Sequence, residues 1–279
     1  MPVPAESDLR HRHDFFFRAP FIAQFELAPS LLACQNRKLM RKTESPRAHA
    51  LAADDMLMAV EIFQETLRGM EFLQSVEPAV TMFGSARIPP RHKYYRLARD
   101  TGFAFARAGY GVITGGGPGL MEAANRGARQ AKGRSIGCNI TLPFEQKPNR
   151  YVDAFMEFKY FHVRKHMLRK ASNAIILLPG GLGTLDEIFE ALTLMQTSKS
   201  RLLPVVVMGI DFWSHLREFM HNAMLGHGTI SRSDLSLYTA TDDPAEAVAL
   251  VRAVTKAKHR ATAVRRIVRE HRARKGFAV

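Results

Sequence analysis

A glycine-rich turn stands in the middle of the chain, where residues 174–194 read AIILLPGGLGTLDEIFEALTL. Gly180, Gly181 and Gly183 form a backbone that can turn sharply and approach a ligand without Cβ atoms in the way. The apolar run before them predicts a buried parallel strand, and the helical spacing after them predicts a helix. Because the free N–H groups and the positive dipole end of a helix begin at such a turn, the stretch favours a phosphate site.

Glu187 is an acidic residue shortly after this turn that could take part in chemistry. Thr184 stands where an N-cap is expected, and Glu187 follows three residues later, at the spacing of a capping box. Glu187 therefore has two interpretations. It is either a cap that satisfies a free N–H group or a carboxylate directed into a nucleotide site, and the motif alone favours neither.

A pair of basic residues, Arg164 and Lys165, stands upstream of the glycine turn in the stretch FHVRKHMLRK. Spacing alone favours the solvated basic face of a helix. The alternative is that the fold brings Arg164 to the glycine turn, where its guanidinium fork could clamp a phosphate or offset charge on a sugar.

Further polar residues have a structural interpretation that competes with ligand contact. Glu122 could be only a helix-dipole acid, whereas Glu145 follows an expected strand and could reach the same edge of the sheet as the glycine turn. Asn125, His162 and Gln196 interrupt apolar patterns, and buried polar groups need partners whether or not a ligand is present. The sequence shows no Ser-His-Asp order, no H-E-x-x-H motif and no metal-ligand spacing, so we expect no metal.

The elements that must position these residues alternate between apolar runs and helical patterns. We expect strands at 79–83, 111–114, 135–142, 155–161, 175–178 and 203–208, with a short edge strand at 237–239. Helices are expected at about 48–72, 94–108, 120–132, 163–170, 184–195, 212–224 and 243–254. This alternation predicts βαβ units and a parallel sheet whose strand C-terminal ends share one edge, where ligands bind near the switch point.

Neither glycine-rich turn is a cofactor signature. Residues 115–120 read GGGPGL, which is not the G-x-G-x-x-G pattern, and no acidic residue about 20 positions later could hold a ribose. No Gly-Lys-Ser or Gly-Lys-Thr follows either turn, so a P-loop is absent as well. The turns favour a phosphate, but they support neither NAD nor ATP hydrolysis, and we expect no cofactor.

Composition is typical of a globular protein that stays inside the cell. Among the 279 residues, 46% are hydrophobic, and no apolar run reaches the ~18 residues of a membrane span. Cys34 and Cys138 are too far apart to suggest a disulfide framework or a zinc site, which points to a reducing compartment. The first residues have no signal-peptide layout, so we expect a cytoplasmic protein without membrane contact.

The positive charge is concentrated near the C-terminus. Residues 252–275 contain ten Lys or Arg and one acid, Glu270, so this stretch alone carries +9 of the net charge of +14. A solvated tail is the favoured interpretation. Contact between the basic tail and nucleic acid is the alternative, which binding that weakens steeply with salt would support.

Four longer stretches resemble the LOG family of cytokinin riboside 5′-monophosphate phosphoribohydrolases, long mislabelled as lysine decarboxylases. They are GGGPGLMEAANRGA (115–128), IGCNITLPFEQKPN (136–149), FKYFHVRKHM (158–167) and LPGGLGTLDEIFEALTLMQT (178–197). The similarity runs from about residue 78 to residue 250 and includes FGSAR (83–87) and TDDPAEAV (241–248). No motif offers a Schiff-base lysine with a pyridinium partner, which decarboxylase chemistry would need.

The resemblance implies an α/β fold, a Rossmann-like doubly wound parallel sheet with an N-terminal helical extension and a basic C-terminal tail. We expect an arm and helix over 1–75, the nucleotide-binding catalytic domain over 76–254 and the tail over 255–279. The apolar residues of the arm, which include Phe15–Phe17, favour packing on the body or on a partner subunit. The family also implies a homodimer or a higher homo-oligomer.

The resemblance assigns a role to each candidate residue of the site. It implies that Arg164 and Glu187 are catalytic. Substrate binding is implied for a larger set, of which the glycine turn and Thr184 hold the phosphate: Ser85, Gly117, Met121, Glu145, Lys165, Gly180, Gly181, Gly183, Thr184 and Thr193.

The expected reaction is hydrolysis of the N-glycosidic bond of a nucleoside 5′-monophosphate, such as AMP or a cytokinin riboside monophosphate. The products are a free base and ribose 5-phosphate. The competing hypothesis is a non-enzymatic protein of the same fold that binds or carries a nucleotide or cofactor. The joint presence of Arg164 and Glu187 favours the enzyme, because a pure binder would not need both.

Overall fold

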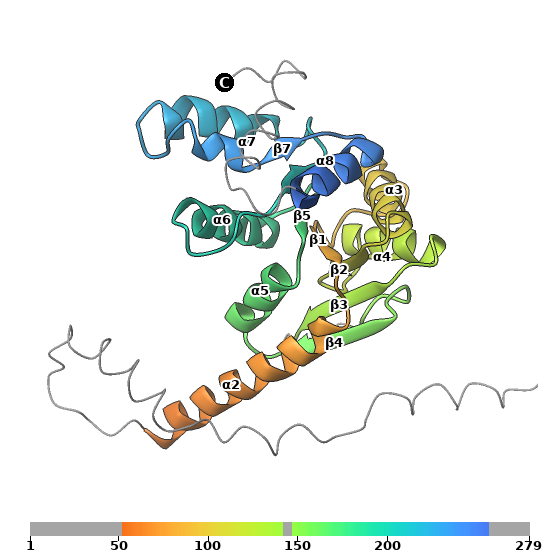
Figure 1. The fold of residues 1–279 in the computed structure, drawn as a ribbon, viewed down its shortest axis with the longest axis vertical. Helices are drawn as coiled ribbons and strands as arrows, with labels where there is room; N and C mark the ends of the chain where they lie inside the picture. The colour runs from red at the N-terminus through yellow and green to blue at the C-terminus, as the bar shows by residue number, and fades with distance from the viewer. Residues whose placement is uncertain (1–51, 142–146, 257–279) are drawn as a thin grey trace, which may run out of the picture. The chain divides into compact units, whose positions relative to one another are not determined.

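The computed structural model of the protein describes residues 52–141 and 147–256 (Figure 1). The predictions for the N-terminal arm, for Glu145 and for most of the basic tail therefore lie outside the described residues. The strands are β1 (Ala79–Phe83), β2 (Gly111–Thr114), β3 (Ser135–Ile140), β4 (Ala154–Phe158), β5 (Ala174–Leu177), β6 (Val205–Val207) and β7 (Thr239–Ala240). The helices are α2 (Ala53–Gln74), α3 (Lys93–Arg107), α4 (Leu120–Gln130), α5 (Phe161–Lys170), α6 (Leu182–Gln196), α7 (Ser214–Phe219), η3 (Met220–Leu225), η4 (Asp234–Leu237) and α8 (Pro244–Lys256).

All seven strands form one parallel sheet in the order β4-β3-β2-β1-β5-β6-β7. The chain builds outward from β1 to β4, returns to place β5 on the other side of β1, and then builds outward again to β7. This is the doubly wound arrangement, and it confirms the predicted fold class. The order reverses between β1 and β5, so the loops that follow these two strands mark the switch point where an open α/β sheet binds ligands.

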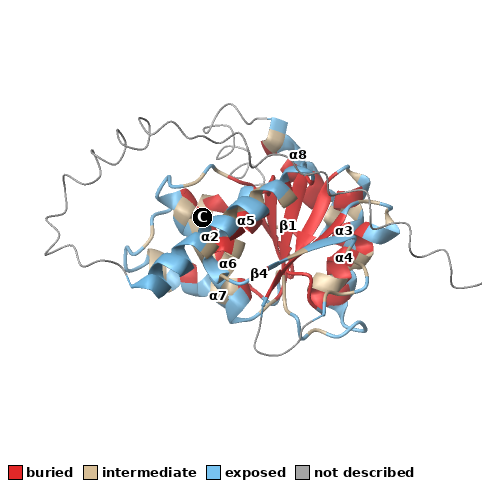
Figure 2. Cartoon of the chain, turned by 90° about the horizontal axis from the view of Figure 1, so that it is seen from below, coloured by how far each residue is buried: buried red, intermediate tan, exposed pale blue. Residues whose placement is uncertain are grey.

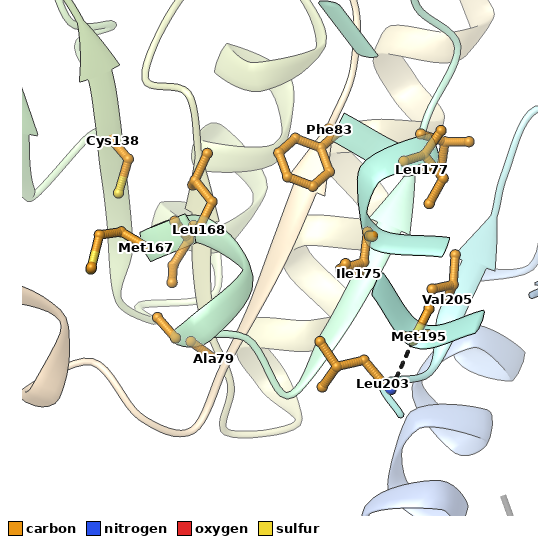
Figure 3. Close-up of a cluster of buried hydrophobic side chains, with 14 of the residues drawn as sticks. Ala79, Phe83, Cys138, Met167, Leu168, Ile175, Leu177, Met195, Leu203 and Val205 are labelled. Carbon is orange, nitrogen blue, oxygen red and sulfur yellow. Dashed lines mark hydrogen bonds between the residues drawn. The ribbon is translucent and has the colours of Figure 1, made fainter. Parts of the chain in front are cut away.

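The central strands are buried along their whole length because helices cover both faces of the sheet (Figure 2). In β5, Ile175 and Leu177 face the side covered by α5 and α6, together with Met195 and Leu203 (Figure 3). Alternate residues such as Ile176 pack on the other side, against α3, α4 and α8. Two apolar layers thus hold the sheet rigidly, and with it the loops at its C-terminal edge.

Helix α2 packs against β4, the edge strand of the sheet, and against α5. Its buried Glu65 accepts hydrogen bonds from the N–H groups of Lys159 at 2.6 Å and Tyr160 at 3.2 Å. These two residues were expected to belong to a strand reaching residue 161, but the strand ends at Phe158. The Glu65 carboxylate takes their N–H groups, and α5 begins directly afterwards.

The segment expected as one helix over 212–224 consists of two parts. Helix α7 spans six residues and continues into η3, a turn of π-helix. Met220 at the junction is buried in the core, with Leu216 and Met224 packed against it. In the described part of the chain, no helix is both long enough and apolar enough to cross a bilayer.

Candidate functional site

A cavity of about 560 Å³ lies at the C-terminal edge of the sheet, at the switch point between β1 and β5. Its walls come from the end of β1 and the loop to Arg87, from Gly115 after β2 and from Met121 of α4. The opposite wall is made by α5 and by the first turns of α6. Five segments that are distant in sequence thus meet where the fold places ligands.

Helix α6 begins earlier than the sequence predicts. Gly181 is its N-cap, without a side-chain cap, and the carbonyl oxygen of Gly181 accepts the N–H groups of Thr184 and Leu185, each at 3.0 Å. Thr184 therefore lies inside the first turn and is not the expected N-cap, so the interpretation of Glu187 as part of a capping box is wrong. Because a glycine can begin the helix without a side-chain cap, the carboxylate of Glu187 is left for the cavity, which it lines.

The three glycines of the turn differ in whether a Cβ atom at their position would meet another atom of the protein. A Cβ atom at Gly180 would lie 2.1 Å from the Thr184 Oγ1 and 2.5 Å from its Cβ, so the protein's own packing requires glycine there. A Cβ atom at Gly181 or Gly183 would meet no atom within 4 Å. Both of these positions line the cavity, so the space above their backbone is open to a ligand.

This difference predicts opposite effects for two matched alanine variants. Gly183→Ala is expected to keep its free energy of unfolding or to raise it by up to about 1 kcal/mol, because alanine favours a helix. Its methyl group is expected to weaken binding of ribose 5-phosphate. Gly180→Ala is expected to lose roughly 1–3 kcal/mol because its methyl group overlaps Thr184. Thermal unfolding and titration calorimetry measure both effects. Unchanged ligand binding by Gly183→Ala would contradict a ligand above this turn.

Arg164 comes to the cavity from α5, one turn into the helix. Its Nε donates a hydrogen bond to the carbonyl oxygen of Cys138 on β3 at 2.7 Å. Its Nη1 lies 3.7 Å from the Glu187 Oε1, and the two side chains are only 13% and 10% exposed. The structure thus brings the two predicted catalytic residues together in the cavity wall, from helices that follow different strands.

Burial changes the proton affinities of this pair. Loss of solvent raises the pKa of Glu187 to about 7, although the positive charges of Arg164 and Lys165 act in the opposite direction. Burial also lowers the pKa of Arg164 from its ordinary value, while Glu187 raises it. A carboxyl group that titrates near neutral pH, next to a guanidinium, is suited to acid–base catalysis.

Gly115 leaves the space that the Arg164 side chain occupies. A Cβ atom at Gly115 would lie 2.6 Å from the Arg164 Nη2 and 2.8 Å from the Met121 Sδ. Both atoms are at the ends of flexible side chains, so they can move aside. We expect Gly115→Ala to fold with a loss of no more than about 1 kcal/mol, but to lower kcat roughly 10- to 100-fold by displacing the guanidinium. Wild-type turnover of this variant would show that the position of Arg164 is not critical.

The backbone beside Gly115 is held by a buried network of polar side chains. The Asn125 Oδ1 accepts hydrogen bonds from the Thr114 hydroxyl at 2.7 Å and from the Asn149 Nδ2 at 3.0 Å. The Asn149 Nδ2 also donates to the carbonyl oxygens of Gly116 and Gly117. Asn125, which the sequence left open between core and ligand contact, is therefore a core residue that fixes the glycine-rich turn after β2.

Three other polar candidates are positioned outside the cavity wall. Glu122 accepts a hydrogen bond from the Tyr95 hydroxyl at 2.8 Å, and Gln196 donates one to Asp234 at 2.9 Å. His162 is exposed at the start of α5. Within the described residues, no group of three or more His, Cys, Asp or Glu side chains could hold a metal ion.

The predicted substrate-binding residues divide according to their position. Those that line the cavity are Ser85, Met121, Gly181, Gly183 and Thr184. Gly180 lies behind Thr184, and Gly117 lies in the turn that Asn149 holds.

Lys165 and Thr193 are not part of the cavity wall. The Lys165 Nζ pairs with Asp186 at 2.9 Å and Glu190 at 2.6 Å, so it binds α5 to α6. Thr193 lies nine residues beyond Thr184 on α6, about 14 Å along the helix, and its carbonyl oxygen accepts the Thr197 hydroxyl.

The side chains of the cavity wall that sequence reasoning missed include Arg87, Phe161, Leu182 and Asp186. Arg87 belongs to the FGSAR stretch, which pointed to the end of β1 without distinguishing its residues. Phe161 and Leu182 are 56% and 86% exposed. The sequence pattern instead favours a buried position for large apolar residues. No sequence signal separated them from the core.

Comparisons with known proteins identify relatives of this chain. A family model described as "possible lysine decarboxylase" matches residues 121–251. A cytokinin riboside 5′-monophosphate phosphoribohydrolase of Mycobacterium tuberculosis is 29% identical over 170 residues, which are 58% of this chain and 88% of that protein. An uncharacterised protein of Archaeoglobus fulgidus is 32% identical over 117 residues, 42% of this chain and 76% of that one.

Among solved structures, the molybdenum cofactor carrier protein of Chlamydomonas reinhardtii matches with a TM-score of 0.47 and 25% identity, over 65% of this chain and 99% of that one.

The matched family model spans both α5, with its Arg-Lys pair, and the glycine turn with Thr184 and Glu187. This chain is therefore a member of the LOG family, whose model carries the lysine decarboxylase description.

Proposed function

We propose that this protein hydrolyses the N-glycosidic bond of a nucleoside 5′-monophosphate, AMP or a cytokinin riboside monophosphate, to a free base and ribose 5-phosphate. The observation that carries the proposal is the buried pair of Arg164 and Glu187 in the wall of a cavity that also contains the open glycine turn of α6. The name of the mycobacterial relative supports a nucleotide substrate.

In the proposed complex, the 5′-phosphate lies on the first turn of α6. Gly181 and Gly183 leave room for it, and the free N–H groups of the helix end bind its oxygens. Thr184 lines the cavity in the same turn and offers a hydroxyl. Binding energy gained at the phosphate then serves to hold the distant N-glycosidic bond in place for reaction, so a nucleoside without phosphate is a poor substrate.

The sugar would extend from the phosphate toward the two catalytic side chains. As the bond between C1′ and the base nitrogen breaks, the bonding electrons leave with the base and positive charge develops on the ribose. The Glu187 carboxylate stabilises that charge and takes a proton from the water that adds to C1′, and this proton then passes to the departing base, which is released as the neutral free base. The Arg164 guanidinium, held in position by the Cys138 carbonyl, orients the sugar and polarises the leaving base.

Ser85 and Met121 are proposed as further substrate contacts because they line the same cavity from the β1 and β2 sides. Lys165 has an indirect role in this proposal. By pairing with Asp186 and Glu190, it neutralises acidic residues next to Glu187 and fixes the distance between α5 and α6.

A panel of 5′-monophosphates tests the proposal. The protein is incubated with AMP, GMP, CMP, UMP and isopentenyladenosine monophosphate, and chromatography measures the free base and ribose 5-phosphate. We expect equal amounts of both products from at least one nucleotide and much slower release from the matching nucleoside. Tight binding without any cleavage across the panel would favour a carrier of the same fold instead.

We also propose that the chain forms a homodimer through α2. Met56, Val60, Phe63 and Leu67 are between 45% and 59% exposed, and their alternating spacing of four, three and four residues forms a stripe along the helix. An apolar stripe of this kind is stabilised by burial against a second copy. Light scattering is expected to give a mass of twice 31.3 kDa, and Phe63→Lys is expected to lower it toward the monomer. A monomeric wild-type protein would contradict this interface.

A further inference from the structure

The loop after β1 is held close to the glycine turn by backbone hydrogen bonds. The Ser85 N–H donates to the carbonyl oxygen of Pro179 at 3.0 Å, and Pro179 directly precedes Gly180. The Ser85 carbonyl oxygen accepts the N–H of Leu120 at 2.9 Å, at the start of α4. The Ser85 Oγ accepts the N–H of Arg87 at 3.1 Å, which closes a tight turn. Arg87 is therefore carried on a loop that is fixed to the start of the phosphate turn.

The other charged side chains of the cavity wall have partners of opposite sign. Arg164 lies beside Glu187, and Asp186 pairs with Lys165. In the part of the chain that the structure describes, Arg87 is the cavity-lining cation that forms no ion pair with a carboxylate. Its exposed guanidinium is free to bind an anion that enters the cavity.

These pairings matter for a phosphate dianion. Without Arg87, the wall has one positive side chain, Arg164, against the two acidic side chains of Asp186 and Glu187, and the helix end contributes only about half a positive charge. A guanidinium supplies a full charge and two parallel N–H donors that match two phosphate oxygens. We infer that Arg87 binds the 5′-phosphate from the side opposite the α6 turn and so makes the site selective for phosphorylated substrates. This inference rests on the proposed function.

The test compares ligands with and without the phosphate. The variants are Arg87→Ala, Arg87→Lys and, as matched control, Arg91→Ala, which changes an exposed arginine four residues later that does not line the cavity. Calorimetry measures binding of ribose 5-phosphate and of inorganic phosphate, and kinetics measure kcat/KM for the best nucleotide of the panel and for its nucleoside.

Arg87→Ala is expected to weaken ribose 5-phosphate binding and to lower kcat/KM for the nucleotide by about 10- to 100-fold, while activity on the nucleoside stays unchanged. Arg87→Lys is expected to recover part of both losses, and Arg91→Ala is expected to match the wild type in both measurements. Equal losses for nucleotide and nucleoside, or wild-type phosphate binding by Arg87→Ala, would overturn the inference. Calorimetry does not require turnover, so it tests the role of Arg87 even if no nucleotide is cleaved. If the wild type releases no base, that result contradicts the proposed function but not the role of Arg87 in phosphate binding.

Discussion

Replacement of Glu187 by glutamine is expected to lower kcat at least about 100-fold while ribose 5-phosphate binding changes little. Glutamine has nearly the same shape, so it leaves no cavity, but it can neither take a proton from water nor offset positive charge on the ribose. Burial raises the pKa of Glu187 to about 7, so its carboxylate is a stronger base than that of an exposed glutamate and is still partly ionised at neutral pH. Single-turnover kinetics on the best nucleotide of the panel measure the chemical step directly.

The chain provides a matched control for this variant one turn further along α6. Glu190 carries the same side chain and pairs with Lys165, but it does not line the cavity. Glu190→Gln is expected to keep kcat within a few-fold of the wild type. A Glu187→Gln protein with full turnover would remove Glu187 from the mechanism, and equal losses in both variants would point to a general disturbance of α6.

Loss of the Arg164 guanidinium is the second large effect. Arg164→Ala is expected to lower kcat by roughly 100-fold, and Arg164→Lys by at least about 10-fold. Lysine cannot donate to the Cys138 carbonyl and face Glu187 at the same time, because it has one terminal nitrogen where arginine has a fork. Lys170→Ala, at the exposed end of the same helix, serves as the control.

The pH dependence of Arg164→Ala checks this assignment in a second way. Catalysis by the Glu187 carboxylate requires its deprotonated form, so wild-type kcat/KM is expected to rise with pH through about 7 and then level off. The positive charge of Arg164 lowers the pKa of Glu187, so its removal raises that pKa further. The rising limb is therefore expected to move to higher pH in Arg164→Ala. A limb that stays in place would show that the two groups do not interact.

The strands and most helices could be predicted because their patterns are local. The apolar runs that became β1 and β5 are buried on both faces, and β1 begins and ends at the predicted residues. The turn at Gly180–Gly183 was recognisable for the same reason, since several glycines directly after an apolar run are typical of a tight turn at the end of a buried strand. Parallel βαβ order then placed the loops of β1 and β5 at one edge of the sheet.

Distances between separate segments could not be predicted, because they depend on strand order and helix packing. Nothing local indicated that Lys165 would bind Asp186 and Glu190 while its neighbour Arg164 turned to the cavity. The start of α6 was misplaced because Thr184 and Glu187 match a capping box, although the tertiary structure uses Glu187 beside Arg164 instead. Predictions from local hydrogen-bonding patterns fail where a buried partner from another segment interacts with the same side chain.

A crystal structure of Glu187→Gln with a bound nucleoside 5′-monophosphate tests the central claim most directly. We expect phosphate oxygens within hydrogen-bond distance of the N–H groups at the start of α6, with C1′ facing residue 187 and the sugar beside Arg164. A nucleotide bound elsewhere, or one with its phosphate at residue 187 and its sugar directed away from Arg164, would contradict this claim.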